Sequence, residues 1–220
     1  MDAKTCQVSA IPWEDSLTNN IVTPRSVCNT YMQLGARGTS VIFSSGDNGV
    51  GVGCDNASFI PTFPCNIFDI FNEASMLIVF YSANCPYVTA VGATQLHGST
   101  EVAAGLSSGG FSNVFDTPSY QSAAVSSYIH ALGSKYAGRY NASGRGIPDV
   151  SALGINYLIE ARGNTTHDNG TSCAAPVFAS VIAKLNDELI SKGRPPLGFL
   201  NPFLYSAKGS AAFNDITSGK

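Results

Sequence analysis

The stretch from residue 25 to Asp47 constrains the fold more than any other part of the chain. Residues 25–35 predict a helix with one apolar face, formed by Val27, Cys28, Tyr31, Met32 and Leu34. Residues 39–45 follow as a short apolar strand that stops at Gly46 and Asp47. A helix that leads into a buried strand is half of a parallel crossover, so the sequence predicts an α/β fold. Ligand groups gather at the carboxyl ends of such strands, which makes Asp47 a candidate site residue, although aspartate is also common in plain turns.

The rest of the chain continues the same alternation of strands and helices. Strands are predicted at residues 87–94, 148–152 and 157–161, and helices at 121–132, 177–186 and 200–205. A glycine- and serine-rich loop at residues 105–110 interrupts this pattern. At 220 residues, without repeats or linkers, the chain is expected to form one domain.

A Gly-Thr-Ser turn precedes the predicted helix at 177–186 and marks a candidate nucleophile. Ser172 follows Gly170 and Thr171 and stands four residues before Pro176. A hydroxyl at a helix start lies among unpaired backbone N–H groups and in the positive field of the helix dipole. A nucleophilic serine and its oxyanion need those surroundings. The alternative is a serine that only caps the helix.

Composition excludes several classes of partner. The net charge of −3 gives no electrostatic footprint for nucleic acid, and no apolar run approaches the roughly 20 residues of a membrane span. No secretory leader is expected, since residues 1–4 lead straight into mixed sequence. Four Asn-x-Ser/Thr sequons nevertheless suit a secreted protein, and they start at Asn56, Asn141, Asn164 and Asn169. We expect the Asn169 sequon to stay empty if Ser172 is catalytic.

The six cysteines have no zinc-type spacing. Cys54 and Cys85 flank one loop region, which favours a disulfide between them. Cys28 and Cys173 stand in apolar contexts and are expected to be buried thiols.

Several short motifs, in this order along the chain, together resemble one family. They are Ser44-Ser45-Gly46-Asp47-Asn48-Gly49, Cys85-Pro86-Tyr87-Val88-Thr89, Ser107-Ser108-Gly109-Gly110-Phe111-Ser112, Gly146-Ile147-Pro148-Asp149-Val150-Ser151-Ala152, Asn169-Gly170-Thr171-Ser172 and Asn214-Asp215-Ile216-Thr217. The chain resembles the sedolisins, or serine-carboxyl peptidases, and most closely their fungal tripeptidyl-peptidase branch. The resemblance covers most of residues 1–220.

The resemblance implies a subtilisin-like fold, with a parallel sheet flanked by helices, and a peptidase that acts on peptide or protein substrates outside the cell. It implies a Ser-Glu-Asp triad in which Ser172 is the nucleophile and Asp47 is the aspartate of the oxyanion hole. A carboxyl group donates a hydrogen bond to an oxyanion only when protonated, whereas a glutamate base must be ionised, and acidic pH serves both needs. The family's calcium site implies Asp215 and Ile216 as ligands.

The loop of Ser107, Ser108, Gly109 and Gly110 is a candidate substrate-binding strand, because open backbone can pair with an extended peptide. It can equally be a flexible turn.

Three departures from the family change these expectations. The family's catalytic Glu and Asp precede the segment that this chain contains, so the fold is expected to be incomplete at both ends and the chain inactive alone. The downstream calcium ligands are likewise absent, so calcium is expected to bind weakly or not at all. Residues 65–82 form an apolar insertion, which is either a retained in-frame intron or a lineage insertion.

Two other readings stay open. A conventional Ser-His-Asp hydrolase would use one of three histidines, His97, His130 or His167. A catalytically inert chain would bind peptides through the loop at residues 107–112. No sequence feature fixes the oligomeric state.

Overall fold

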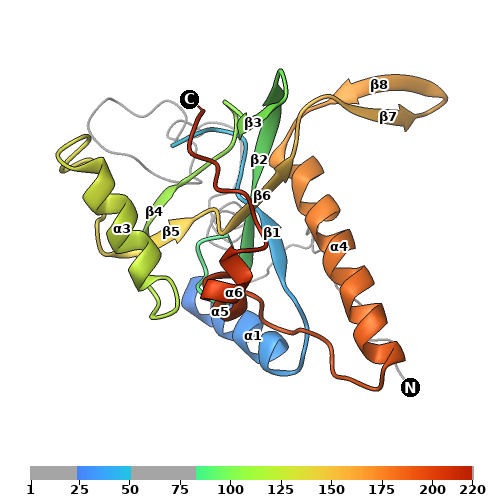
Figure 1. Cartoon of the computed structure of the whole chain (residues 1–220), viewed down its shortest axis with the longest axis horizontal. Coiled ribbons are helices and arrows are strands. Elements are labelled where there is room, and N and C mark those ends of the chain that lie inside the picture. The colour runs from blue at the N-terminus through green and yellow to red at the C-terminus, as the bar shows by residue number, and fades with distance from the viewer. Residues whose placement is uncertain (1–23, 51–82, 220) are drawn as a thin grey trace, which may run out of the picture.

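A four-stranded sheet organises the protein, whose computed structural model describes residues 24–50 and 83–219 (Figure 1). The central strand is β2 (Thr89–His97), which pairs in parallel with both β1 (Ile42–Ser44) and β6 (Val150–Leu153). Since Val91 of β2 is opposite both Ser44 and Val150, these two strands lie on opposite edges of β2. Strand β3 (Thr100–Ala103) adds an antiparallel pair at the far end of β2. The α/β prediction with parallel strands is confirmed.

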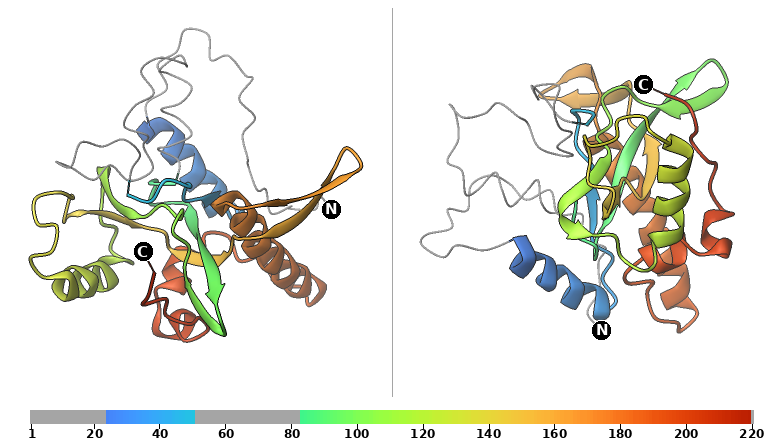
Figure 2. Two further views of the ribbon diagram at one scale, coloured as in Figure 1. Left: turned by 90° about the horizontal axis from the view of Figure 1, so that it is seen from above. Right: turned by 90° about the vertical axis from the view of Figure 1, so that its left-hand side faces the viewer.

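Helix α4 (Thr171–Ser191) covers one face of this sheet, while α1 (Pro24–Ala36) covers the opposite face (Figure 2). On the α4 side the core is formed mainly by small and branched residues together with one aromatic ring, and these are Ile42, Val91, Ala93, Ala174, Ala175, Phe178, Ala179 and Ile182. On the α1 side, the ring of Tyr31 packs against that of Phe43, with centroids 5.4 Å apart. Neighbouring residues of a strand point to opposite faces, so Ile42 packs on the α4 side while Phe43 packs on the α1 side.

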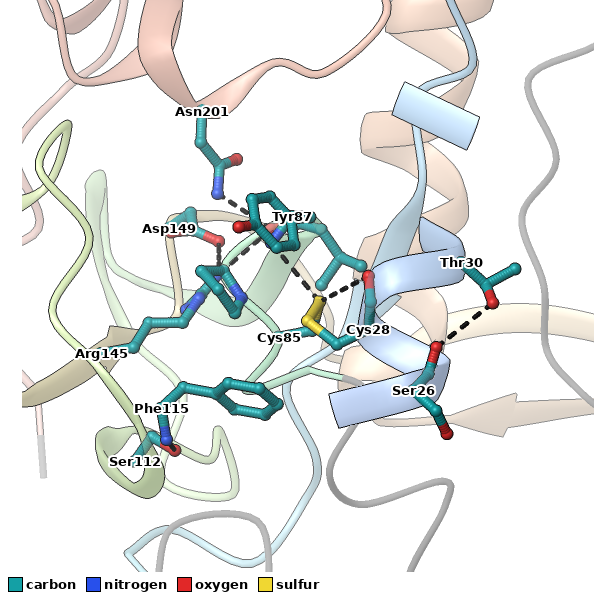
Figure 3. The surroundings of a disulfide bond; sticks show 12 residues. Ser26, Cys28, Thr30, Cys85, Tyr87, Ser112, Phe115, Arg145, Asp149 and Asn201 are labelled. Carbon is teal, nitrogen blue, oxygen red and sulfur yellow. Dashed lines mark hydrogen bonds and ion pairs between the residues drawn. A yellow bond between two sulfur atoms is a disulfide. The ribbon is translucent and has the colours of Figure 1, made fainter. Parts of the chain in front are cut away.

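A disulfide joins α1 to the segment that enters β2, and it corrects the pairing expected from the sequence. Cys85 bonds to Cys28, with the two Cα atoms 5.5 Å apart, and not to Cys54 (Figure 3). The expectation that Cys28 is a thiol was therefore wrong as well. Cys54 lies outside the described residues. The third cysteine in the described part of the chain, Cys173, is a free thiol that is half-buried.

Smaller elements surround this core. Strands β4 (Gly110–Asp116) and β5 (Gly144–Ile147) form an antiparallel pair beside α3 (Ser122–Leu132). Strands β7 (Tyr157–Ala161) and β8 (Asn164–Asp168) form a hairpin that projects beyond the sheet (Figure 1). Two short helices, α5 (Asn201–Leu204) and α6 (Ala207–Ser210), follow α4.

A buried ion pair fastens β5 to the start of β6. The guanidinium of Arg145 donates to Asp149 Oδ2 at 2.6 Å, and both side chains are fully buried (Figure 3). Asp149 Oδ2 also accepts from the backbone N–H of Ala90, while Oδ1 accepts from the hydroxyl of Tyr205 at 2.9 Å. Burial opposes the charge on Arg145, yet the carboxylate beside it raises the pKa of the guanidinium above its usual value.

Most predicted elements are present, and two of the helices, α1 and α4, are longer than the sequence indicated. Helix α1 extends the predicted 25–35 segment by one residue at each end, and α4 begins at Thr171 instead of Val177. The apolar insertion at residues 65–82 lies outside the described residues. Across residues 24–50 and 83–219, no helix has both the length and the apolar character needed to cross a membrane.

Candidate active site

The end of β1 delivers Asp47 to the edge of the sheet. The backbone N–H of Ser45 still donates to Val91 O at 2.9 Å, as the last bond to β2. Gly46 then turns the chain with a φ of 105°, a value that favours glycine. Asp47 follows and is exposed at the carboxyl end of the strand, where the sequence placed it.

Two glycines set the start of α4 against the carboxyl-terminal half of β2. The N–H of Gly154 donates to Thr94 O at 3.0 Å, and the N–H of Gly170 donates to Gly154 O at 2.8 Å. A Cβ at Gly154 would lie 2.6 Å from the Cβ of Ala93 and 2.8 Å from Gly170 O, so a side chain there would push the helix start away. This spacing places Ser172 in the first turn of α4, next to the end of β1.

Thr171 clamps the carboxylate of Asp47. Asp47 Oδ1 accepts from the Thr171 backbone N–H at 2.6 Å and from its hydroxyl at 2.8 Å. The same hydroxyl accepts from the N–H of Gly46 at 3.1 Å, and Thr171 is fully buried. Because Oδ1 already accepts two hydrogen bonds, a proton on this carboxyl belongs on Oδ2.

The other carboxylate oxygen, Oδ2, lies beside the Gly170-Thr171-Ser172 segment. A Cβ built on Gly170 would lie 3.0 Å from Asp47 Oδ2 and 3.5 Å from the Ser172 backbone nitrogen. Any larger residue at 170 would therefore stand between Asp47 and Ser172. The structure brings together the two residues that the sequence proposed as nucleophile and oxyanion partner. Their catalytic roles stay predictions.

Ser172 is exposed, and no residue in the described part of the chain hydrogen-bonds to its Oγ. The three histidines lie on separate elements, with His97 at the end of β2, His130 in α3 and His167 in β8, and all three side chains are exposed. None of them hydrogen-bonds to Ser172, so no histidine among the described residues is paired with the candidate nucleophile.

The candidate substrate loop is anchored to the Asp47 turn. Ser108 donates its backbone N–H to Gly46 O at 2.8 Å, and its buried Oγ accepts from the N–H of Asn48 at 3.0 Å. Ser107 Oγ accepts from the N–H of Ala93 at 2.9 Å. Both hydroxyls thus have partners within the protein and fix the loop beside the site.

Gly109 N–H reaches Gly49 O at 3.2 Å, and Gly110 begins β4. Any contact of this loop with a peptide would come from its remaining backbone groups. Substrate binding by Ser107, Ser108, Gly109 and Gly110 stays a prediction.

Asp215 and Ile216 do not by themselves make a calcium site. Calcium takes about six to eight oxygen ligands. Asp215 is exposed in the C-terminal coil, and the described residues contain no cluster of three or more His, Cys, Asp or Glu side chains that would suit a metal. No step of the chemistry below depends on calcium.

The sequence motifs did not predict the surroundings of two site residues, Thr171 and Cys173. The Gly-Thr-Ser motif indicates a role for its serine but not for Thr171, whose contacts with Asp47 join positions 124 residues apart. Cys173 was expected to be a buried thiol and is half-buried; burial, with the charges of Asp168 and Asp47, raises its pKa. Burial also raises the pKa of Tyr157, and the nearby thiol of Cys173 raises it further.

The family model described as the subtilase family matches residues 12–193. The chain belongs to the subtilase family. Among curated relatives, this subtilase chain is 46% identical over 200 residues to "Probable tripeptidyl-peptidase SED3" of Arthroderma benhamiae. It is 42% identical over 195 residues to "Probable tripeptidyl-peptidase SED2" of the same organism. These matches cover 88% and 89% of the chain but only 30% of each relative's length.

A solved structure supports the same fold. The chain is similar to Pseudomonas sedolisin, a serine-carboxyl proteinase, with 25% sequence identity and a TM-score of 0.62. That match covers 90% of this chain and 51% of the sedolisin chain. The prediction of a subtilisin-like α/β fold and the resemblance to sedolisins are thereby confirmed.

Proposed function

We propose that this subtilase chain carries the nucleophile and the oxyanion carboxyl of a sedolisin-type serine peptidase. Its substrates would be polypeptides with a free N-terminus, from which it releases tripeptides at acidic pH. The observation that carries the proposal is the placement of Asp47, clamped by Thr171, beside the exposed Ser172 at a helix start. The tripeptidyl-peptidase names of its relatives support the substrate class.

The chemistry follows from this geometry. Ser172 Oγ adds to the substrate carbonyl as its proton passes to a base, and the peptide C–N bond then breaks as the leaving amine takes up that proton. The carbonyl oxygen becomes negative in between. A protonated Asp47 would donate from Oδ2 to that oxygen, since Oδ1 is held by Thr171. Water then cleaves the acyl-enzyme and releases the tripeptide.

A turnover assay tests the proposal, with matched variants made in a longer protein that joins this chain to a segment carrying the family's Glu and Asp. The substrates are a tripeptide with a fluorogenic amide and its N-acetylated form, across acidic to neutral pH. Ser172→Ala should abolish turnover of the free tripeptide, whereas Ser180→Ala should not. Ser180 is a suitable control because it is exposed on the same helix and donates only to Pro176 O.

Asp47 variants separate its charge from its donor role. Asp47→Asn keeps a donor at every pH and should extend activity toward neutral pH. Asp47→Leu removes the donor and should lower kcat by about 10²–10³-fold. Equal pH profiles for Asp47→Asn and the unchanged protein would contradict the proposed role of Asp47.

The same assay distinguishes the alternatives. Neutral-pH turnover that is lost on His130→Ala or His167→Ala would favour a Ser-His-Asp hydrolase. Peptide binding without turnover, unaffected by Ser172→Ala, would favour a catalytically inert binder. The inactivity of the 220-residue chain alone stays a prediction, which turnover by that chain would contradict.

We place the protein outside the cell or in the secretory pathway as part of this proposal. The disulfide between Cys28 and Cys85 supports this location, because such bonds form and persist in oxidising compartments. Secretion into the medium of the source cells, measured with an antibody to the chain, tests it.

A further inference from the structure

The described residues include three Asn-x-Ser/Thr sequons, and the structure places them in different surroundings. They start at Asn141, Asn164 and Asn169. N-glycosylation attaches a bulky group to the asparagine amide of an Asn-x-Ser/Thr sequon, and it favours sequons that lie on the surface. The three sites can be compared on that basis.

Asn169 is unsuited to a glycan. Its Oδ1 accepts from the N–H of Asn156 at 2.6 Å and closes the base of the β7–β8 hairpin. The sequon hydroxyl belongs to Thr171, which is fully buried in the clamp on Asp47. A sugar on Asn169 would stand at the nucleophile turn, three residues from Ser172.

Asn141 is constrained on both sides of its amide. Its Nδ2 donates to Ser112 O at 2.8 Å, and its Oδ1 accepts from the backbone N–H and the hydroxyl of Ser143. Asn141 is half-buried beside β4. A glycan on Nδ2 would have to share that nitrogen with the bond to Ser112.

Asn164 differs from both in its hydrogen bonding and in the exposure of its sequon. It is the first residue of β8 at the tip of the hairpin, after a turn in which Arg162 and Gly163 both have positive φ. Its side chain and that of Thr166 are exposed, and neither makes a hydrogen bond to another described residue. Because strand side chains alternate, Asn164 and Thr166 share one face.

The hairpin also separates this asparagine from the site. Five residues of extended chain from Asn164 to Asn169 span about 17 Å. Figure 1 and Figure 2 both show the hairpin tip projecting away from the sheet. A glycan at the tip therefore leaves Ser172 open to substrate.

A glycan would also protect an exposed element. In the described part of the protein, β7 and β8 form a sheet of their own, so each strand has one open edge. Leu158 on β7 is 65% exposed. Open edges with apolar side chains invite pairing with other chains, and a bulky hydrated group at the tip hinders that approach.

We infer that Asn164 is the N-glycosylated residue of this hairpin and that Asn169 stays unmodified. Asn164 Nδ2 forms a bond to the anomeric carbon of a lipid-diphosphate-linked oligosaccharide. The bond from that carbon to the diphosphate oxygen breaks, the lipid diphosphate leaves, and Nδ2 loses one proton. The inference rests on the secretory location in the proposed function but not on peptidase activity.

The test is site occupancy in the full chain, expressed with a cleavable leader in a fungal host and digested for peptide mass mapping. Enzymatic release of N-glycans converts each occupied asparagine to aspartate, which marks it. We expect conversion at Asn164 and none at Asn169. Because the added leader directs the chain into the secretory pathway, the occupancy result does not depend on the proposed native location or on catalysis.

Matched variants make the result specific. Asn164→Gln and Thr166→Val should each remove one glycan and increase gel mobility by the same step. Thr165→Val, which changes the adjacent exposed threonine but keeps the sequon, should leave mobility unchanged. An unconverted Asn164 peptide, or a glycan on Asn169, would overturn the inference.

Discussion

The buried pair of Arg145 and Asp149 provides the sharpest test of the fold. Arg145→Met removes the guanidinium but keeps an unbranched chain in its place. Asp149 is then left buried with a full negative charge and with neutral donors only, among them the N–H of Ala90 and the hydroxyl of Tyr205. The free energy of unfolding should fall because that charge loses its counter-ion.

The magnitude follows from the burial. Both side chains are 0% exposed, and breaking such a pair by removing one partner costs about 3–5 kcal/mol. Because neutral groups still donate hydrogen bonds to Asp149, Arg145→Met should cost near the lower end of that range, about 3 kcal/mol. Asp149→Leu should cost more, about 5 kcal/mol, because Arg145 then keeps its charge with neutral partners, among them the carbonyls of Val88 and Gly146.

A surface pair with the same sequence spacing is the control. Lys192 and Glu188 also stand four residues apart, but their side chains are 61% and 62% exposed. Lys192→Met should therefore change stability by less than about 0.5 kcal/mol. Urea unfolding followed by circular dichroism measures all three variants on one scale.

The double variant completes the comparison. Combining Arg145→Met with Asp149→Leu removes both charges, so its destabilisation should be smaller than the sum of the single changes. If Arg145→Met unfolds at the same urea concentration as Lys192→Met, the reasoning from burial is refuted.

Three further predictions use other contacts. Replacing Cys28 and Cys85 with alanine opens a cross-link between residues 57 apart, which should lower stability by about 4 kcal/mol in thermal unfolding, and peptide mapping of the oxidised protein should recover these two cysteines together. The pKa of Tyr120 is raised, mainly by burial, from its ordinary 10 to about 12. The folded state therefore holds this proton more tightly than the unfolded state, so stability is full below pH 10 and falls as pH rises toward 12. Tyr120→Phe should flatten that decline in alkaline urea titrations. Gly154→Ala, whose new methyl would meet the Cβ of Ala93 at 2.6 Å, should lower the melting temperature markedly, and an unchanged value would contradict that close approach.

Local patterns were enough to predict the elements that frame the site. The apolar face at residues 25–35 and the apolar run at 39–45 became α1 and β1, with Asp47 at the end of the strand. These features depend on side-chain periodicity and turn chemistry within a few residues. The placement of Ser172 at a helix start was predicted for the same reason.

Long-range partners could not be predicted in the same way. The sequence favoured Cys54 for Cys85 because the two flank one loop, but α1 packs against the segment that enters β2 and brings Cys28 there instead. Nothing near Arg145 in the sequence shows that its charge is buried. That fact depends on β2, β5 and β6 meeting at one point.

The clamp between Asp47 and Thr171 joins positions 124 residues apart, and this sets the order of events during synthesis. At about 5–20 residues per second, roughly 6–25 seconds pass between translation of the first residue and of the second. Throughout that time the end of β1 lacks the hydroxyl that receives the Gly46 N–H. The clamp on the Asp47 carboxylate therefore cannot form until Thr171 has been made.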